Sequence, residues 1–176
     1  GYVERYRCEI GVLYVGHNML GTLNHWLDHK KLEFHSIAQK PACVYVGPNH
    51  PFYKRKTIKA SELAGLKFIQ PSKDHFSMEN HLEPLGPELS GIDIIHPTVT
   101  TNSDHALISF LSDTDLCSLG IFLLRASYQR NDIKALQIEG TEKNLHLGYI
   151  KHINAALSNP ANGFIDILTA FVENCN

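Results

Sequence analysis

The sequence predicts an α/β fold in which mainly parallel sheets are covered by helices on both faces. Apolar, β-branched segments alternate along the chain with segments whose apolar residues recur at helical spacing. The chain has 176 residues, of which 43% are hydrophobic and 19% are charged. A chain of this length buries roughly 70% of its unfolded surface, which provides a core without disulfides or metals. The composition therefore excludes a disordered tail, a coiled coil and a collagen-like repeat.

The first third of the chain predicts a strand, a helix and two further strands, followed by a loop. These elements occupy residues 9–15, 20–27, 32–38 and 42–46. The strands are rich in β-branched and apolar residues, and the helix repeats leucine at helical spacing. Residues 47–51 are predicted to form a loop, because they contain Pro48 and Pro51 and proline cannot donate a hydrogen bond to a neighbouring strand.

The rest of the chain again alternates short strands with helices. The predicted strands are residues 67–69, 92–95, 98–100, 116–119, 133–138 and 145–149, and the predicted helices are residues 61–64, 77–85, 106–111 and 160–172. Gly65 stops the first of these helices, and Asn102 or Ser103 caps the third. Asn159 is the predicted cap of the last helix, with Pro160 in its first position.

Charge and hydropathy exclude several classes of protein. Sixteen Lys and Arg against 18 Asp and Glu give a net charge of −2, which argues against a surface built to neutralise phosphates. The longest apolar stretch, residues 116–124, is about half of the ~20 residues that a membrane-spanning helix needs. Residues 1–5 are not followed by the apolar core of a secretory signal. We therefore expect no membrane contact and no secretion.

The four cysteines favour a reducing compartment. They are widely spaced and form no C-x-x-C motif, and Cys43 and Cys117 lie inside apolar strand-like segments. Buried free thiols in the cytoplasm are the favoured interpretation, although counting alone leaves disulfides open.

One pair of histidines has the spacing of a metal site. His25 and His29 lie at i and i+4 of the first predicted helix, and this spacing can bind zinc. The glutamate of H-E-x-x-H is missing, however, and solvated histidines beside Lys30 and Lys31 explain the pattern equally well. We expect no metal ligand and no cofactor.

No catalytic motif is found. The phosphate-binding G-x-G-x-x-G and P-loop patterns and the G-x-S-x-G nucleophile elbow are all absent. The basic cluster formed by Lys54, Arg55, Lys56 and Lys59 is expected to be a solvated turn. Scattered Asp, His and Ser residues leave a triad assembled in space as an open alternative.

Two small polar segments follow strands directly and are candidates for anion binding. They contain Gln70 and Ser72 in one case, and Thr101, Asn102 and Ser103 in the other. In α/β sheets, ligands bind beyond the carboxyl ends of strands, where helix N-termini offer free N–H groups. The alternative is simple helix capping by Asn102 or Ser103.

Several stretches in a fixed order resemble the effector-binding domain of LysR-type transcriptional regulators. The sequence VYVGPNHPF at residues 44–52 is similar to the family's strand and His-Pro loop. KTIKASELAGLKFI at residues 56–69 is similar to its basic turn, Leu-Ala helix and Phe-Ile strand, and residues 99–138 follow in the family's order. Residues 9–15 look like the family's "D-l-a-I" strand. The resemblance departs at residues 115–120, DLCSLG, where the family has G-x-G-x-x-L-P.

The resemblance implies two Rossmann-like lobes joined by two crossover strands, as in type II periplasmic binding proteins. Lobe one is then residues 1–40 plus 137–176, and lobe two is residues 41–136. The effector is expected between the lobes, and the matching positions are Tyr14, Gly16, Gln70, Ser72, Thr101, Asn102 and Ser103. The family's winged helix-turn-helix and the first part of its lobe one have no counterpart in these residues.

The function that the resemblance implies is sensing of a small-molecule effector, expected to be a carboxylate or another anion. The expected partners are further copies of the chain in a homodimer or homotetramer, with DNA contacted only through a helix-turn-helix that this chain does not contain. A cytoplasmic location and no catalysis are expected. Two alternatives stay open at this point: a free-standing solute-binding module of the same fold, and an α/β enzyme with an unrecognised site.

Overall fold

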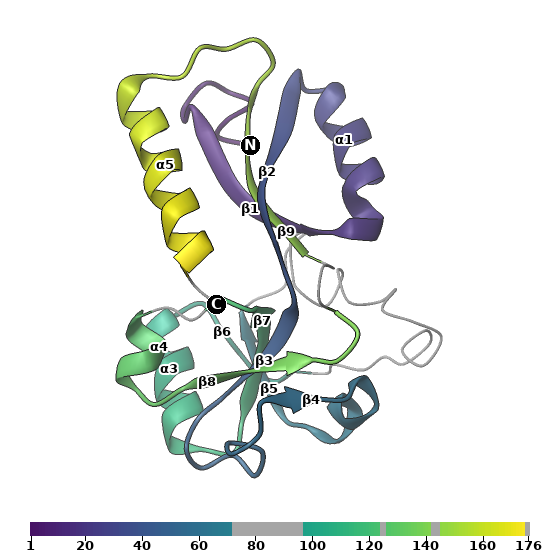
Figure 1. The fold of residues 1–176 in the computed structure, drawn as a ribbon, viewed down its shortest axis with the longest axis vertical. Coiled ribbons are helices and arrows are strands. Elements are labelled where there is room, and N and C mark those ends of the chain that lie inside the picture. Colours follow the sequence, from purple (N-terminus) through teal and green to yellow (C-terminus); the bar gives the residue numbers. More distant parts are fainter. Residues whose placement is uncertain (72–96, 124–125, 142–144, 175–176) are drawn as a thin grey trace.

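The protein folds around two separate sheets, which lie one above the other along the long axis of the molecule (Figure 1). The structure is a computed structural model and describes residues 1–71, 97–123, 126–141 and 145–174. The helix predicted at residues 77–85 and the strand predicted at residues 92–95 lie outside these ranges.

The smaller sheet takes its strands from both ends of the chain. Among the described residues it has three strands in the order β1 (Ile10–Gly16), β9 (Leu145–His152) and β2 (Leu32–Lys40), and both pairings are antiparallel. A short 3₁₀ turn, η1 (His17–Met19), leads from β1 into α1 (Leu20–Asp28). This helix covers one face of the sheet, and its buried leucines, Leu23 and Leu27, pack against residues of β1 and β2.

The last helix, α5 (Asn159–Asn174), begins at Asn159, so the predicted cap at that residue is wrong. Ser158 provides the cap instead, because its hydroxyl accepts from the Ala161 N–H at 3.4 Å. Glu9 fixes Ser158 in turn, by accepting from its N–H at 2.8 Å and from its hydroxyl at 2.7 Å.

The larger sheet is formed by the middle of the chain. Within the described residues its order is β4-β8-β3-β7-β5-β6. The strands are β3 (Ala42–Val46), β4 (Thr57–Ile58), β5 (Phe68–Pro71), β6 (Pro97–Thr101), β7 (Cys117–Ile121) and β8 (Lys134–Ile138), and the helical elements are η2 (Ala60–Gly65), α3 (Asp104–Asp113) and α4 (Ala126–Arg130).

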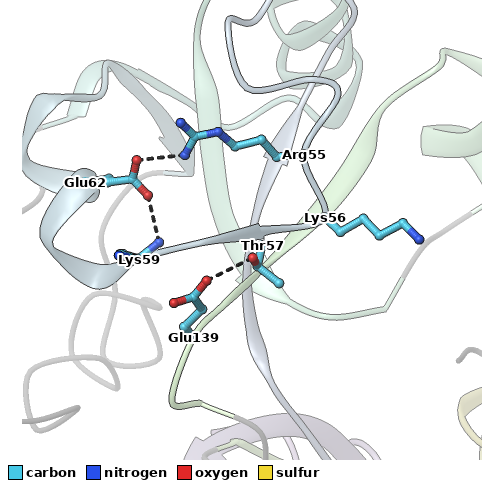
Figure 2. A pocket seen from close by; sticks show the side chains of 6 residues that line it. All are labelled: Arg55, Lys56, Thr57, Lys59, Glu62 and Glu139. Atoms are coloured by element: carbon cyan, nitrogen blue, oxygen red, sulfur yellow. Dashed lines mark hydrogen bonds and ion pairs between the residues drawn. The ribbon is translucent and has the colours of Figure 1, made fainter.

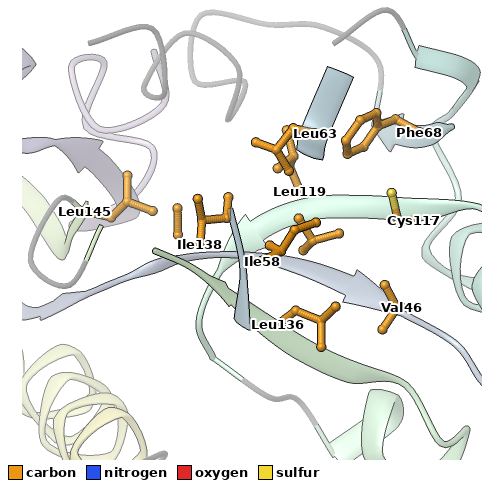
Figure 3. Packing of buried hydrophobic residues seen from close by; sticks show 11 residues of the cluster. Val46, Ile58, Leu63, Phe68, Cys117, Leu119, Leu136, Ile138 and Leu145 are labelled. Carbon is orange, nitrogen blue, oxygen red and sulfur yellow. The ribbon is translucent and has the colours of Figure 1, made fainter. Parts of the chain in front are cut away.

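The central strand β3 is buried on both faces, as its uninterrupted apolar sequence predicts. Ala42, Val44 and Val46 face a cluster that includes η2, and Cys43 and Tyr45 face a second cluster under α3 and α4. Figure 3 shows the first cluster, in which side chains from six strands (β3, β4, β5, β7, β8 and β9) and η2 pack together.

The expectation of mainly parallel sheets is wrong, because the described part of the smaller sheet is antiparallel and the larger sheet is mixed. β3 pairs antiparallel with both β7 and β8, whereas β4 with β8, β5 with β6 and β5 with β7 are parallel. The physical reason is the direct passage from β2 to β3 and from β8 to β9. Strands that leave one sheet to enter another are not joined to their neighbours by the helical crossovers that make strands parallel.

The two crossovers implied by the resemblance are confirmed. Pro41 alone separates β2 from β3, and residues 139–144 separate β8 from β9. The buried side chain of Thr141 joins the two passages: its hydroxyl accepts from the Ala42 N–H at 3.1 Å and lies 2.6 Å from the Ile138 carbonyl oxygen, to which it donates. Leu145 and Tyr14, both from strands of the smaller sheet, pack against the core cluster of the larger sheet.

Replacing Thr141 by Val should lower the free energy of unfolding by about 1–3 kcal/mol, because the buried Ala42 N–H loses its hydroxyl acceptor. Urea denaturation followed by circular dichroism measures the change. Thr57→Val is the matched control, since that residue is exposed and its hydroxyl donates to exposed Glu139. Equal stability of the Thr141→Val variant and the natural chain would contradict the role given to this hydroxyl.

Candidate functional site

A pocket lies where β5 and β6 end and α3 begins. Parallel pairing places Pro71 opposite Thr101, so the carboxyl ends of the two strands meet at one edge of the sheet. The pocket has a volume of about 190 Å³ and is lined by Pro71, Thr101, Asn102, Ser103, Asp104 and Leu107. Three residues that the sequence analysis selected therefore line one pocket, while Ser72 lies outside the described residues.

Local hydrogen bonds shape the wall of this pocket. The Thr101 hydroxyl accepts from the Ser103 N–H at 3.1 Å, and the Ser103 hydroxyl caps α3 by accepting from the Ala106 N–H at 3.3 Å. Each hydroxyl keeps its own proton for donation. The helix N-terminus contributes a positive dipole end, whereas Asp104 adds a carboxylate to the first turn. The pocket therefore offers polar donors beside one negative charge.

Gln70 lies on β5 next to the pocket, but its side chain is buried in the sheet. Its Oε1 atom accepts from the Ser118 hydroxyl at 2.7 Å and from the Leu119 N–H at 3.0 Å. β5 and β7 share one ladder position, Phe68 with Cys117, so the carboxamide continues the connection between the two strands beyond it. This contact holds β5 in place immediately before Pro71.

Tyr14 and Gly16 lie at the end of β1, beside the crossovers. Tyr14 packs against the core cluster of the larger sheet, and buried Gly16 is paired with Leu145 at the start of β9. They belong to the smaller sheet and do not line the pocket at Thr101. The predicted ligand residues thus fall into two groups, one on each sheet.

Three polar residues that sequence reasoning missed as a group meet beside Gly16. The His17 Nδ1 and His146 Nε2 atoms are 3.0 Å apart, and the Ser36 hydroxyl lies 3.1 Å from the other ring nitrogen of His146. The residues follow or lie on β1, β2 and β9, so only the antiparallel pairing brings them together. The alternating pattern around His146 marks a strand but gives no sign of its neighbours.

Burial lowers the pKa of His146, the central residue of the three. The pKa of His146 lies below its ordinary value of 6.5, first because the ring is removed from water and second because of the nearby His17. The neutral imidazole is therefore the favoured form, and it can relay hydrogen bonds between Ser36 and His17.

The predicted solvated basic turn borders a larger, open pocket of about 680 Å³, shown in Figure 2. Arg55 is paired with Glu62 at 2.7 Å, and the Thr57 hydroxyl donates to Glu139 at 3.0 Å. Lys56 extends away from these residues (Figure 2). Two carboxylates, Glu62 and Glu139, offset two of the three cations that line this surface, which leaves it with only a weak attraction for an anion.

The described cysteines have the character of packing residues. Cys43 and Cys117 are buried free thiols, and Cys8 is exposed. Burial raises the pKa of both buried thiols, that of Cys117 to about 12. In the part of the chain that the structure describes, no three His, Cys, Asp or Glu side chains cluster as metal ligands. No helix among the same residues is long and apolar enough to cross a membrane.

Two α/β lobes joined by two crossovers define a ligand-binding domain of the type II periplasmic-binding-protein class. The family can be stated more closely. Residues 19–173 match the LysR substrate binding domain, and the chain belongs to that family, whose members are effector-sensing regulatory domains of LysR-type regulators. No curated protein sequence matches the chain.

Solved structures share this fold at low sequence identity. The effector-binding domain of QuiR in complex with shikimate has a TM-score of 0.62 and 18% identity, over 98% of this chain and 75% of that one. The MetR regulatory domain from N. meningitidis has a TM-score of 0.62 and 12% identity, over 97% and 74% of the two chains. The CcmR regulatory domain from Synechocystis PCC6803 in complex with 2-PG has a TM-score of 0.62 and 13% identity, over 98% and 77%.

Stability should decrease as the pH falls from 7 to 5. The pKa of His146 is lowered in the folded state, so below pH ~6.5 the unfolded chain binds more protons than the folded chain does. His50, whose pKa burial also lowers, acts in the same direction. Urea denaturation at pH 5, 6 and 7 measures how steeply the free energy of unfolding changes with pH.

The His146→Gln variant should show a shallower loss of stability with acid, because glutamine keeps hydrogen-bonding groups near Ser36 without taking up a proton. His105→Gln, at an exposed position of α3, is the matched control and should keep the natural slope. If the His146→Gln variant keeps the slope of the natural chain, His146 is not a source of the pH dependence.

Proposed function

We propose that this chain is the cytoplasmic effector-sensing domain of a LysR-type transcription factor, without catalytic chemistry of its own. DNA is contacted through a helix-turn-helix that is not among these residues, and the net charge of −2 supports this division of roles. The proposed lobes are residues 1–40 plus 137–176, which hold the smaller sheet, and residues 41–136, which hold all of the larger sheet except the last two residues of β8, Gln137 and Ile138.

The proposed effector is a small anion with a carboxylate group, and the pocket at the end of β6 is the observation that carries this proposal. Thr101, Asn102 and Ser103 provide hydroxyl and amide donors at the N-terminus of α3, where the helix dipole favours negative charge. The proposed site also includes Ser72, which lies outside the described residues, and Gln70 positions β5 beside the pocket. Tyr14 and Gly16 contribute from the other lobe.

The volume of the pocket and the fold's relatives support a small ligand. A pocket of about 190 Å³ is smaller than the ~300–1,000 Å³ typical of drug-sized ligands. The related QuiR domain was solved with shikimate, a hydroxylated carboxylic acid. Hydroxyl donors and one helix N-terminus match a ligand of that chemistry, in which a carboxylate accepts hydrogen bonds.

The proposed mechanism is a change in the angle between the lobes. An effector held by groups from both lobes binds the closed arrangement more strongly, and this difference in affinity shifts the population towards it. In a homodimer or homotetramer, the new angle alters the spacing of the attached DNA-binding domains.

Replacing both Thr101 and Ser103 by Ala should weaken effector binding by about 1–3 kcal/mol, because two hydroxyl donors to a charged ligand are lost. A panel of small hydroxylated carboxylic acids that includes shikimate provides the probe, and calorimetry measures the dissociation constant. Ser112→Ala is the matched control, since this serine lies at the opposite end of α3 and bonds to the Asn131 carbonyl. Unchanged affinity in the double variant would contradict the assignment of the effector site to the pocket at Thr101, but it would not affect membership of the family.

Replacing Asp104 by Asn should strengthen binding of an anionic probe by roughly 2–5-fold, because a negative charge in the lining of the pocket is removed. The same calorimetric titration at low and high salt measures the effect, which salt should reduce. A variant that binds more weakly would contradict the anionic class and indicate a cationic or neutral ligand.

A further inference from the structure

Two histidines form a separate feature on the exposed side of α1, away from the pocket at Thr101. His25 and His29 are one helical turn apart, and their Nε2 atoms are 3.3 Å from each other. The rings are nearly perpendicular, with an interplanar angle of 82°. Leu23 and Leu27 are buried against the sheet, so the orientation of the helix keeps both imidazoles at the surface.

The distance between the two nitrogens fits a shared metal ion. Zinc–nitrogen bonds of about 2.0–2.1 Å in tetrahedral geometry place two ligand nitrogens about 3.3–3.4 Å apart. A direct hydrogen bond between imidazoles is shorter, and the pair formed by His17 and His146 in the same chain shows this with a separation of 3.0 Å. The His25–His29 contact of 3.3 Å is at the long end of the range for a hydrogen bond, and it equals the separation of two ligands of one tetrahedral cation.

The contact between the rings changes the expectation drawn from the sequence, and we propose that His25 and His29 bind a divalent transition-metal ion of the class that prefers imidazole, namely Zn²⁺, Cu²⁺ or Ni²⁺. The protein supplies two ligands and water completes the coordination. Ca²⁺ and Mg²⁺ are excluded because they require oxygen ligands. The nearby ammonium group of Lys30 is paired with Glu4 at 2.7 Å, which offsets its repulsion of a cation. This site is independent of the proposed effector function.

Bound metal acts as a clamp across the last turn of α1. The ion links two side chains four residues apart and binds the folded helix in preference to the unfolded chain, so it stabilises the folded state. Because α1 covers the smaller sheet, the stabilisation extends to the element that holds Leu23 and Leu27 against that sheet.

The single tryptophan of the chain reports on this site directly. Trp26 lies between the two histidines in the sequence and its side chain is 47% exposed. Titration with Cu²⁺ should quench its fluorescence saturably with one equivalent, and Ni²⁺ and Zn²⁺ should compete. Ca²⁺ should have no effect. Quenching should weaken as the pH is lowered, because protons compete for the imidazole nitrogens.

Substitutions test whether the two histidines act together. Either His25→Gln or His29→Gln should weaken Cu²⁺ binding by at least about tenfold, and the double variant should lose little more, because each single change already breaks the chelate. The metal should raise the melting temperature of the natural chain and not that of the double variant. His105→Gln, exposed on α3, is the control and should bind as the natural chain does. Full quenching of Trp26 in the double variant, or single variants with unchanged affinity, would overturn the proposal.

Discussion

The meeting of the two crossovers is the constraint on which the rest of the structure depends. One passage consists of Pro41 alone, so β2 and β3 are nearly continuous and the lobes lie close together. Thr141 ties the second passage to the first through one buried hydroxyl. Because Leu145 and Tyr14 also enter the core of the other lobe, the lobes share apolar packing at this point. Two short passages that meet at one point favour rotation about the crossovers over other relative movements, which is the change that the proposed mechanism requires.

The two groups of polar residues follow from the same topology. Parallel strands β5 and β6 end together, and the chain then starts α3, so hydroxyls and a helix N-terminus collect at one edge. Antiparallel strands of the smaller sheet instead bring His17 and His146 together beside the crossovers. The first group offers donors at an open edge. The second group is partly buried and hydrogen-bonded, and burial lowers the pKa of its central residue, His146.

Local patterns in the sequence predict local structure well, but contacts between distant strands need the fold. The strand β3 was predictable because five apolar residues between two breakers are typical of a strand buried on both faces. The cap of α3 was predictable to one of two residues, Asn102 or Ser103, and the structure selects Ser103. The pairing of β9 between β1 and β2 was not, because it joins residues more than 100 positions apart. The group of Ser36, His17 and His146 depends on that pairing. Ligand binding by the residues at Thr101 stays a prediction, although the pocket there exists.

The position of β9 in the chain also determines the order in which the two sheets can form during synthesis. Among the described strands, β1 and β2 do not pair with each other, and each pairs with β9, which begins at residue 145. All strands of the larger sheet lie between residues 42 and 138, so that sheet can form while the ribosome is still adding the last segment. The smaller sheet cannot form until β9 has been synthesised, and its two outer strands, β1 and β2, lack this partner until then. A chain truncated before residue 145 therefore lacks the strand that pairs with both β1 and β2, and their unpaired edges favour aggregation.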